Sequence, residues 1–376
     1  MSLLTDAATE AVYPLLPVFI TQVLGGPPIA LGIVEGAADA TTSALKVMSG
    51  RWSDRLGVRK PIVVLGYTLS SLIRPFMAVT SSWAHVFAIR VTDRVGKGLR
   101  GAPRDAMLAA LAPPGQRGRV FGYHWAMDHA GAAVGPLLAT LFLLFYPDDY
   151  RLLFALTIVP GLLAVVTLLR VPEAIDKPEG LSPHPRSTSG DKPSGLSIPL
   201  PAPLKRYFLV LSVFTLGNSS DAFLLLQLSQ AGVPLTGLTL LWSAQHAIKA
   251  ALTMRGGMWS DRFGRRALII SGWVVYAIVY AGFAFSTSVY ALVGWFLIYS
   301  SYSAAVEGSE KALVADLTPD ALRATAFGWH AAVQGFGALA AGILFGLLWQ
   351  WFGAPTAFLT GAMLALLAAV LLVVYK

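Results

Sequence analysis

The chain has 376 residues, of which 55% are hydrophobic and only 13% are charged. A soluble domain carries roughly 25% charged residues, so this sequence cannot cover a water-exposed surface and must face lipid. Its net charge is +8, but the basic residues lie in short turns between apolar stretches, which favours an anionic membrane face over nucleic acid as partner. The absence of cysteine excludes disulfides and thiol chemistry, and the first apolar run lacks the basic start of a cleavable signal peptide.

Twelve segments are long and apolar enough to cross ~30 Å of hydrocarbon as helices. In the first half they are Leu3–Leu24, Ala30–Ser49, Pro61–Thr80, Trp83–Leu108, Val120–Tyr146 and Leu152–Leu169. In the second half they are Leu204–Leu228, Gly237–Met254, Ala267–Phe285, Val289–Leu313, Ala324–Trp349 and Pro355–Tyr375. We therefore predict an all-α membrane protein with twelve transmembrane helices in two pseudo-symmetric six-helix bundles. The bundles would span residues 1–170 and 204–376, and the Pro-, Ser- and Gly-rich stretch 171–203 would be a flexible cytoplasmic linker.

A basic turn follows the second predicted helix and returns in the second half. The stretch Gly50–Lys60 recurs as Gly257–Arg266, 207 positions later, with Gly, Trp, Ser, Asp, Arg, Gly and a terminal basic residue in step. A second repeated segment follows, since Arg117–His124 is matched by Arg323–His330 at an offset of 206. Two repeated segments at nearly the same offset indicate an internal duplication.

Lysine and arginine gather in every second turn, such as Arg51–Lys60, Arg117–Arg119 and Arg255–Arg266, while the turns between them are almost free of both. Because positive residues stay on the cytoplasmic side, we expect a multi-pass protein of the cytoplasmic (inner) membrane. Both termini would be cytoplasmic.

The repeated turn resembles the signature between helices 2 and 3 of the major facilitator superfamily, Gly-x-x-x-Asp-Arg-x-Gly-x-Arg-Lys. The first copy matches at Gly50, Asp54, Arg55, Gly57, Arg59 and Lys60. The second copy matches the weaker form of the signature at Gly257, Asp261, Arg262, Gly264 and Arg266. The resemblance covers the whole chain apart from the linker. It implies a transporter of small molecules that works by alternating access between two parallel repeats.

The same resemblance assigns a gate and suggests a subgroup. It implies that Asp105, at the inner end of helix 4, pairs with Arg55 or Arg59, and that Asp54 faces the start of helix 11. Arg94 followed by Gly98 resembles the family's helix-4 pattern, although Lys97 stands where a neutral residue is usual. Gly131–Ala139 resembles the helix-5 pattern of drug and metabolite antiporters, with Ala139 in place of the last glycine.

Charged residues inside predicted helices are the candidates for substrate and proton binding, because an unpaired charge at mid-bilayer costs ~3 kcal/mol or more. The first half contains most of them: Glu10, Glu35, Asp39, Arg74, Asp93, Arg94, Lys97, Arg100, His124 and Asp128. The second half adds His246, and its other buried-polar candidates are Asp221, Lys249, Glu307, Glu310 and Lys311. At 1.5 Å of rise per residue, each acid has a base at its own depth. This predicts a polar cavity or a buried ion-pair network within the first bundle, and ion pairs that only lock helices together are the alternative.

Proton coupling needs a carboxylate that is protonated in one state and ionised in the other. Glu10, Asp39 and Asp128 are placed best for this. Lys97, Arg94 and Arg100 would either hold those carboxylates or bind an anionic group of the substrate, and the sequence leaves both open.

The main hypothesis is proton-coupled efflux of a small organic solute by a monomeric secondary transporter. One alternative is proton-coupled uptake of an anionic metabolite, which the basic stripe on helix 4 favours. Another is a transporter-like receptor or sensor without flux. We expect no enzyme activity, because no nucleophile–base arrangement has a recognisable spacing. No cofactor and no metal site are expected, since the histidines do not form a ligand set with carboxylates.

Overall fold

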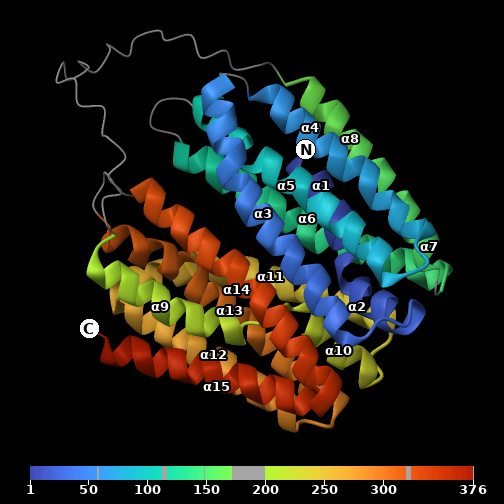
Figure 1. Ribbon diagram of the computed structural model, residues 1–376. Helices are drawn as coiled ribbons and strands as arrows, with labels where there is room; N and C mark the ends of the chain where they lie inside the picture. The colour runs from blue at the N-terminus through green and yellow to red at the C-terminus, as the bar shows by residue number, and fades with distance from the viewer. Residues whose placement is uncertain (57–58, 112–116, 148, 172–199, 319–322, 376) are drawn as a thin grey trace, which may run out of the picture.

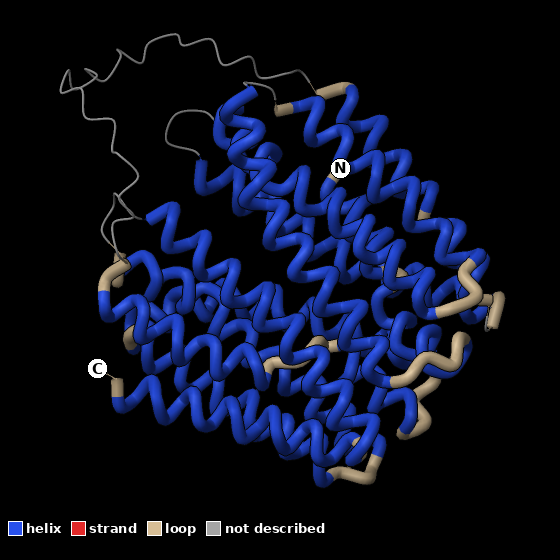
Figure 2. The backbone as a smooth tube through the Cα atoms, viewed as in Figure 1, coloured by secondary structure: helices blue, strands red, loops and turns tan. Residues whose placement is uncertain are grey.

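The computed structural model describes residues 1–56, 59–111, 117–147, 149–171, 200–318 and 323–375, and all regular elements in these ranges are helical (Figure 2). The first predicted span is built from α1 (Ser2–Glu10), a 3₁₀ turn η1 (Tyr13–Leu15), α2 (Leu16–Val18) and a π-helical turn η2 (Phe19–Val23). The following spans of the first half are α3 (Pro28–Leu56), α4 (Lys60–Ile73) with η3 (Arg74–Val79), α5 (Trp83–Leu111), α6 (Arg117–Phe145) and α7 (Tyr150–Leu156) with α8 (Ile158–Leu169).

The second half repeats this plan. Its spans are α9 (Ala202–Gly217) with α10 (Ala222–Gln230), α11 (Leu235–Phe263), α12 (Arg265–Phe285), α13 (Val289–Asp316), α14 (Arg323–Phe352) and α15 (Ala354–Val374). The protein thus has the predicted fold of twelve helices in two halves. Most of the predicted linker, residues 172–199, lies outside the described part of the chain.

Nine of the spans in the described residues are long and apolar enough to cross a membrane on length and composition alone. The three others are α3, α5 and α11. These helices hold most of the charged candidates, among them Asp39, Lys97 and Lys249. Their lower hydropathy is explained by their position, since each lines the space between the two halves and need not face lipid on all sides.

The basic turns lie at one end of the molecule, which we call the linker end because α8 ends and α9 begins there (Figure 1). Lys60 Nζ donates to the Leu169 carbonyl at 3.3 Å, so the first basic turn lies beside the end of α8. Arg266 Nη1 donates to the Tyr375 carbonyl at 3.4 Å, so the second lies beside the end of α15. Turns of like charge therefore gather on one side, as the loop pattern predicts.

At the opposite end the two halves are held together along α3 and α14. A Cβ added to Gly36 would lie 2.6 Å from the Leu339 Cα, and one added to Gly346 would lie 2.6 Å from the Ile29 Cα. Between them, Gly32 and Gly342 approach so closely that a Cβ on either would overlap the other's carbonyl group. We call this contact the glycine seam. Since only glycine lacks a Cβ, the seam requires glycine on both helices.

A second contact joins the halves along α6 and α11. The hydroxyls of Thr140 and Thr239 are 2.5 Å apart, and Ser243 Oγ donates to the Ala133 carbonyl at 2.9 Å. Toward the linker end, α3 and α14 diverge (Figure 1). The space between the halves is therefore closed at the opposite end and widens toward the linker end.

Two spans are interrupted where they border this space. Pro14 and Pro17 follow the end of α1, and the chain continues there as 3₁₀ and π-helical turns, because proline cannot donate a backbone hydrogen bond. The break between α9 and α10, at Asn218–Asp221, was not predicted. The polar run Asn218-Ser219-Ser220-Asp221, inside an otherwise apolar segment, is the signal that could have identified it. Pro103 and Pro136 lie within continuous helices.

Candidate functional site

Three adjoining polar pockets of about 310, 310 and 290 Å³ lie between the two halves. The part near the linker end and the deepest part share Lys249, and the third part shares Thr42 with the former and Asp39 with the latter. We call the whole the central cavity. Its charged lining residues are Asp6, Glu10, Asp39, Lys46, Lys97, Arg100, Arg104, Asp128, Asp221, Lys249 and Glu310. Of the predicted site residues, Glu10, Asp39, Lys97, Arg100, Asp128 and His246 line it.

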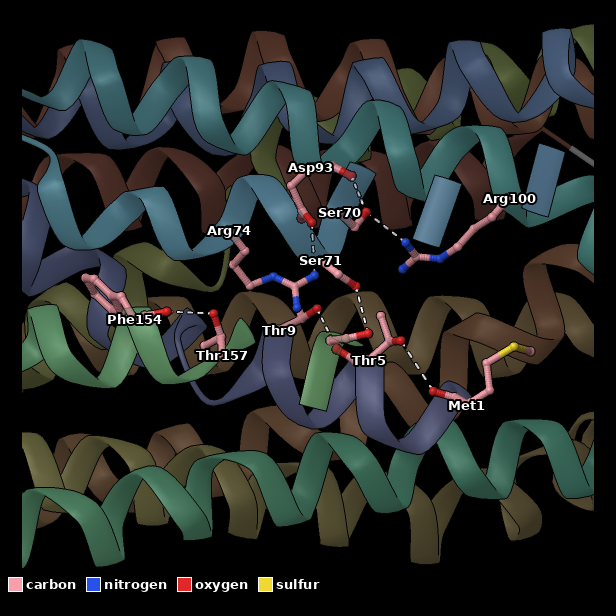
Figure 3. Close-up of polar contacts among 11 residues, drawn as sticks. Met1, Thr5, Thr9, Ser70, Ser71, Arg74, Asp93, Arg100, Phe154 and Thr157 are labelled. Carbon is pink, nitrogen blue, oxygen red and sulfur yellow. Dashed lines mark hydrogen bonds and ion pairs between the residues drawn. The ribbon is translucent and has the colours of Figure 1, made fainter. Parts of the chain in front are cut away.

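Three of the predicted site residues form ion pairs inside the first bundle and do not line the central cavity. Arg90 donates to both Glu35 oxygens at 2.7 Å, joining α5 to α3, and both side chains are at most 5% exposed. Arg74 Nη2 donates to Asp93 at 2.9 Å, also with both side chains 5% exposed (Figure 3). For Glu35, Arg74 and Asp93 the geometry matches the alternative raised from the sequence, pairs that fasten helices together.

The Glu35–Arg90 pair gives a stability prediction. In Glu35→Gln the guanidinium of Arg90 stays buried without a counter-charge, which costs about 3–5 kcal/mol for buried pairs. We expect a lower thermal unfolding temperature of the purified protein in detergent. The matched control is Asp316→Asn, which removes the exposed pair with Arg265 and should change stability by about 1 kcal/mol or less. Equal melting of the Glu35→Gln variant and the unmodified chain would show that the pair does not stabilise the bundle.

Arg100 borders both the ion-pair network and the cavity. Its Nη1 donates to Ser70 Oγ at 2.8 Å, and Ser70 Oγ in turn donates to the Asp93 carbonyl at 3.0 Å (Figure 3). Its guanidinium also lies 4.4 Å from the centre of the Tyr67 ring, within cation–π range. These contacts fix the position of one positive charge in the cavity wall.

Asp128 and His124 lie one turn apart on α6, as their spacing predicts. His124 Nε2 is 3.6 Å from Asp128 Oδ2, and Ser2 Oγ of α1 also bonds to Asp128. Asp128 further interacts with Arg104 and Asp6, which line the same part of the cavity. The carboxylate thus lies in a cluster of titratable groups that borders the cavity near the linker end.

Glu10 contacts the opposite half directly. Trp242 Nε1 of α11 donates to Glu10 Oε2 at 3.0 Å. The Trp242 ring stacks on Tyr13 of the first half, with centroids 4.8 Å apart, and lies 4.8 Å from the ring of His246. His246 interacts electrostatically with Glu10. The structure therefore brings together Glu10 and His246, two predicted site residues from different halves, through a tryptophan that the sequence did not single out.

The second half contributes a polar cluster formed by two of its buried-polar candidates, Asp221 and Lys249. Lys249 Nζ of α11 lies 3.6 Å from Asp221 in the break between α9 and α10, and Tyr299 donates to the same carboxylate at 2.7 Å. Tyr13 of the first half reaches this break, since its hydroxyl is 3.1 Å from Ser220 Oγ. Asp221 and Lys249 are charges within apolar segments, the same signal that identified the first-half residues.

Another cluster is centred on Glu310 of α13, also one of the second-half candidates, which is 3% exposed. Gln334 donates to it at 3.1 Å, and His330 Nε2 lies 3.5 Å from the same oxygen. His330 and Gln334 are 206 residues after His124 and Asp128, so the duplicated helix carries an amide where the first half carries the acid. The internal repeat that identified the duplication could have pointed to His330 and Gln334 as the partners of Glu310.

Asp39, Lys97 and Arg94 are close in the first half without touching. Asp39 interacts electrostatically with Arg94 and Lys97, yet among the described residues none of the three forms an ion pair within 4.0 Å. Arg94 is buried, and its Nε has no hydrogen-bond partner. Asp39 and Lys97 have exposed side chains that project into the cavity.

Most of the predicted gate residues lie outside the part of the protein that the structure describes. This applies to Gly57 and to the side chains of Asp54, Arg55, Asp261 and Arg262. Asp105 is bound by its neighbour Arg104 at 3.0 Å, so its pairing with Arg55 or Arg59 remains a prediction. A Cβ on Gly50 would meet the Ala102 Cβ at 3.3 Å, which places this glycine against α5. In the second half, Arg265 of the basic turn does bond to Asp316 at the end of α13.

We expect Asp54→Asn to slow transport several-fold while the protein stays folded, because the signature resemblance assigns the carboxylate to the gate at the basic turn. Initial rates in proteoliposomes, normalised to the amount of reconstituted protein, are the measurement. Rates equal to those of the unmodified chain would remove Asp54 from the gate.

Among the residues that the structure describes, no three His, Asp or Glu side chains are grouped so as to hold a metal ion. The site is instead a set of carboxylates, ammonium and guanidinium groups and aromatic rings around the central cavity. Such groups can form ion pairs, hydrogen bonds and ring contacts with a solute.

Comparisons with known proteins agree with this architecture. The chain is 32% identical over 381 residues to an uncharacterised MFS-type transporter of Methanocaldococcus jannaschii, covering 99% of this chain and 92% of that one. It is 31% identical over 141 residues to multidrug resistance protein MdtH of Cronobacter sakazakii, covering 38% of this chain and 34% of the relative.

Among solved structures, the nucleoside transporter NupG superposes with a TM-score of 0.80 at 12% identity, covering 100% of this chain and 97% of that one. A D-xylose–proton symporter superposes with a TM-score of 0.76 at 17% identity, covering 99% and 94%. At such low sequence identities the superpositions show the similarity of the fold alone. The family model of the Major Facilitator Superfamily matches residues 1–246 and 207–376. The chain is therefore a multi-pass membrane transporter that belongs to the Major Facilitator Superfamily.

Proposed function

We propose that this transporter exports a small organic solute across the cytoplasmic membrane in exchange for protons, as a monomer with both termini in the cytoplasm. The two halves, residues 1–170 and 204–376, would rock about the central cavity and open it to each side in turn. In this proposal the linker end is the cytoplasmic end, because it carries the basic turns.

The hydrogen bond from Trp242 to Glu10 is the observation that carries the proton-coupling proposal. It joins α1 to α11 across the interface on which the halves would rock. A hydrogen bond to an ionised carboxylate is about twice as strong as one to a neutral group, so protonation of Glu10 weakens the contact between the halves. A proton arriving at Glu10 would thereby favour separation of the two halves at this contact.

Asp128 and Asp39 complete the proposed proton pathway. Asp128 borders the cavity near the linker end, beside His124, and Asp39 lines its deeper parts. A proton could pass between carboxylates that line one water-accessible space. The gate residues Asp54, Arg55 and Asp105 would close this space at the linker end in the other state.

The export direction is supported by the partial likeness to relatives named multidrug resistance proteins and by the helix-5 glycine pattern Gly131–Ala139. Uptake of an anionic metabolite is the second candidate. It is favoured by Lys46, Lys97 and Arg100, which line one part of the cavity. The two candidates differ in whether solute and protons move in opposite directions or together.

Proteoliposomes with a pH-sensitive dye inside separate these candidates. A pH gradient that is acidic outside is imposed, and a panel of toxic amphiphiles and organic acids is loaded inside or added outside. Export predicts that a loaded compound leaves as the lumen acidifies, and that its leaving speeds the acidification. Co-entry of compound and protons would overturn the direction, and flux that is independent of the gradient would overturn the coupling.

A further inference from the structure

The charges that line the central cavity nearly balance. Five basic side chains face six carboxylates across its three parts. The basic ones are Lys46, Lys97, Arg100, Arg104 and Lys249, and the carboxylates are Asp6, Glu10, Asp39, Asp128, Asp221 and Glu310. Because the formal sum is one negative charge, the lining disfavours a ligand with several charges of one sign, which would be costly in a space of low dielectric constant. The formal sum alone does not distinguish a zwitterion from a mono-cation, so the choice depends on which lining groups have no partner within the protein.

Most of these groups already have partners within the protein. Trp242 binds Glu10, Lys249 and Tyr299 bind Asp221, and Gln334 binds Glu310. Arg104 binds Asp105, Arg100 binds Ser70, and Ser2 binds Asp128. Asp6 interacts with Asp128 and lies nearer the linker end of α1 than Glu10. Lys46 has no hydrogen bond or ion pair with a described residue, but it lies nearer the linker end of α3 than Asp39.

Asp39 and Lys97 differ from the paired groups. Neither forms a hydrogen bond or ion pair through its side chain with any described residue, although both project into the cavity. A Cβ on Gly98 would meet the Leu45 Cβ at 2.6 Å and the Thr42 carbonyl at 3.1 Å, so α5 at Lys97 is level with this part of α3. Asp39 then lies about one helical turn deeper, ~5 Å along the axis. A free ammonium and a free carboxylate thus face the same space, offset by the length of a small molecule.

The surroundings of the carboxylate also suit a cation. Tyr13, Tyr299 and Tyr302 line the same part of the cavity as Asp39. The faces of aromatic rings attract ammonium groups. Lys97 instead shares its part of the cavity with Arg100 and Lys46, which suit an anionic group.

We propose that the central cavity binds a zwitterionic solute, with its anionic group at Lys97 and its ammonium group at Asp39 between the tyrosines. The proposal rests on the proposed transport function and names the substrate class of that same cavity. Such a ligand neutralises both free charges and adds no net charge to the cavity. A mono-anion would leave Asp39 uncompensated, and a mono-cation would leave Lys97 uncompensated.

The test uses three zwitterionic probes of different length, L-phenylalanine, γ-aminobutyrate and alanyl-phenylalanine. Each is compared with its N-acetyl derivative, which is an anion, its amide, which is a cation, and the doubly capped neutral form. Binding to the purified full-length chain is measured at millimolar concentrations by thermal stabilisation. For at least one scaffold we expect the zwitterion to bind about tenfold or more tightly than every capped form. The proposal is overturned if a capped form binds as tightly as its parent, or if no scaffold binds in any form.

Two variants assign the ends of the ligand. Lys97→Gln should abolish the preference for the zwitterion over its amide, and Asp39→Asn should abolish the preference over its N-acetyl form. Lys205→Gln, at the exposed start of α9, is the matched control and should retain both preferences. Unchanged preferences in both cavity variants would contradict the assignment. Binding of zwitterions without proton-linked flux would refute the proposed function alone, and proton-linked flux of singly charged compounds only would refute this inference alone.

Discussion

Glu10→Gln is expected to abolish proton-driven transport while the exchange of solute without a gradient continues. Glutamine keeps an oxygen that can accept the Trp242 hydrogen bond, 3.0 Å long in the unmodified chain, but it cannot gain or lose a proton. A hydrogen bond to an ionised group contributes about 1.5–3 kcal/mol. Removing its dependence on protonation corresponds to a change of roughly tenfold or more in the equilibrium between the two states of the transporter. We therefore expect the accelerating effect of a pH gradient on flux to fall at least about tenfold.

The measurement compares gradient-driven flux with counterflow in the same proteoliposomes. Trp242→Phe is a useful second variant, because it keeps an aromatic ring beside Tyr13 and removes the donor to Glu10. It should also weaken the dependence on the gradient. Normal gradient-driven flux in both variants would show that the contact between Glu10 and Trp242 does not couple protons to transport. Loss of counterflow together with driven flux would point to a structural role.

Gly342→Ala is expected to prevent closure of the glycine seam and to stop transport without unfolding the protein. The added Cβ would overlap the carbonyl of Gly32 across the interface. Forcing a methyl group into such a contact costs about 1–3 kcal/mol. The halves can avoid this cost by separating at this end, so the equilibrium should shift roughly 5- to 150-fold toward the state that is open there. A transporter held in one state cannot complete its cycle.

Labelling from each side of the membrane detects this shift. The chain contains no cysteine, so Asn218→Cys places a single thiol in the central cavity. In the otherwise unmodified chain, an impermeant maleimide should reach it mainly from the linker end. With Gly342→Ala, labelling from the opposite end should rise. The matched control is Gly308→Ala, since a Cβ at Gly308 has no atom within 4 Å. Equal labelling in both glycine variants would mean that the seam does not limit closure.

The sequence predicted the twelve spans because apolar length alone determines them. The predicted starts and ends often coincide with the observed ones, as at Trp83 of α5 and Phe285 of α12. The largest differences are in the two helices that precede the basic turns: α11 was predicted to end at Met254 and continues to Phe263, and α3 was predicted to end at Ser49 and continues to Leu56. Each helix runs past the apolar stretch into the basic turn, where hydropathy gives no signal although backbone hydrogen bonding persists.

The sequence could not determine which charged side chains pair with each other in the folded protein. Helical spacing placed Asp128 one turn from His124 correctly, because that pair lies on one helix. The pairs Glu35–Arg90 and Arg74–Asp93 join different helices, and their formation depends on how each helix is rotated in the bundle. The same limit explains why Trp242 was missed, since nothing in its local sequence shows that it faces Glu10.

The second half appeared poor in functional groups because its charges are few and widely spaced along the chain. Folding gathers them, since Asp221 and Lys249 come from different spans, as do Glu310 and His330. The chemistry of such a site depends on contacts between helices. A duplicated sequence offers one remedy, because each candidate in the first half points to its counterpart about 206 positions later.

The most direct test of whether protons move the two halves against each other measures two distances between the halves, one at each end, while the pH is varied. Spin labels on Val47 and Phe327 report separation at the linker end, and labels on Leu144 and Leu240 report separation at the opposite end. All four side chains are exposed. Acidification should lengthen one distance and shorten the other in the unmodified background, and neither should respond in Glu10→Gln. Two distances that stay constant, or that change in the same direction, would contradict alternating access driven by protonation of Glu10.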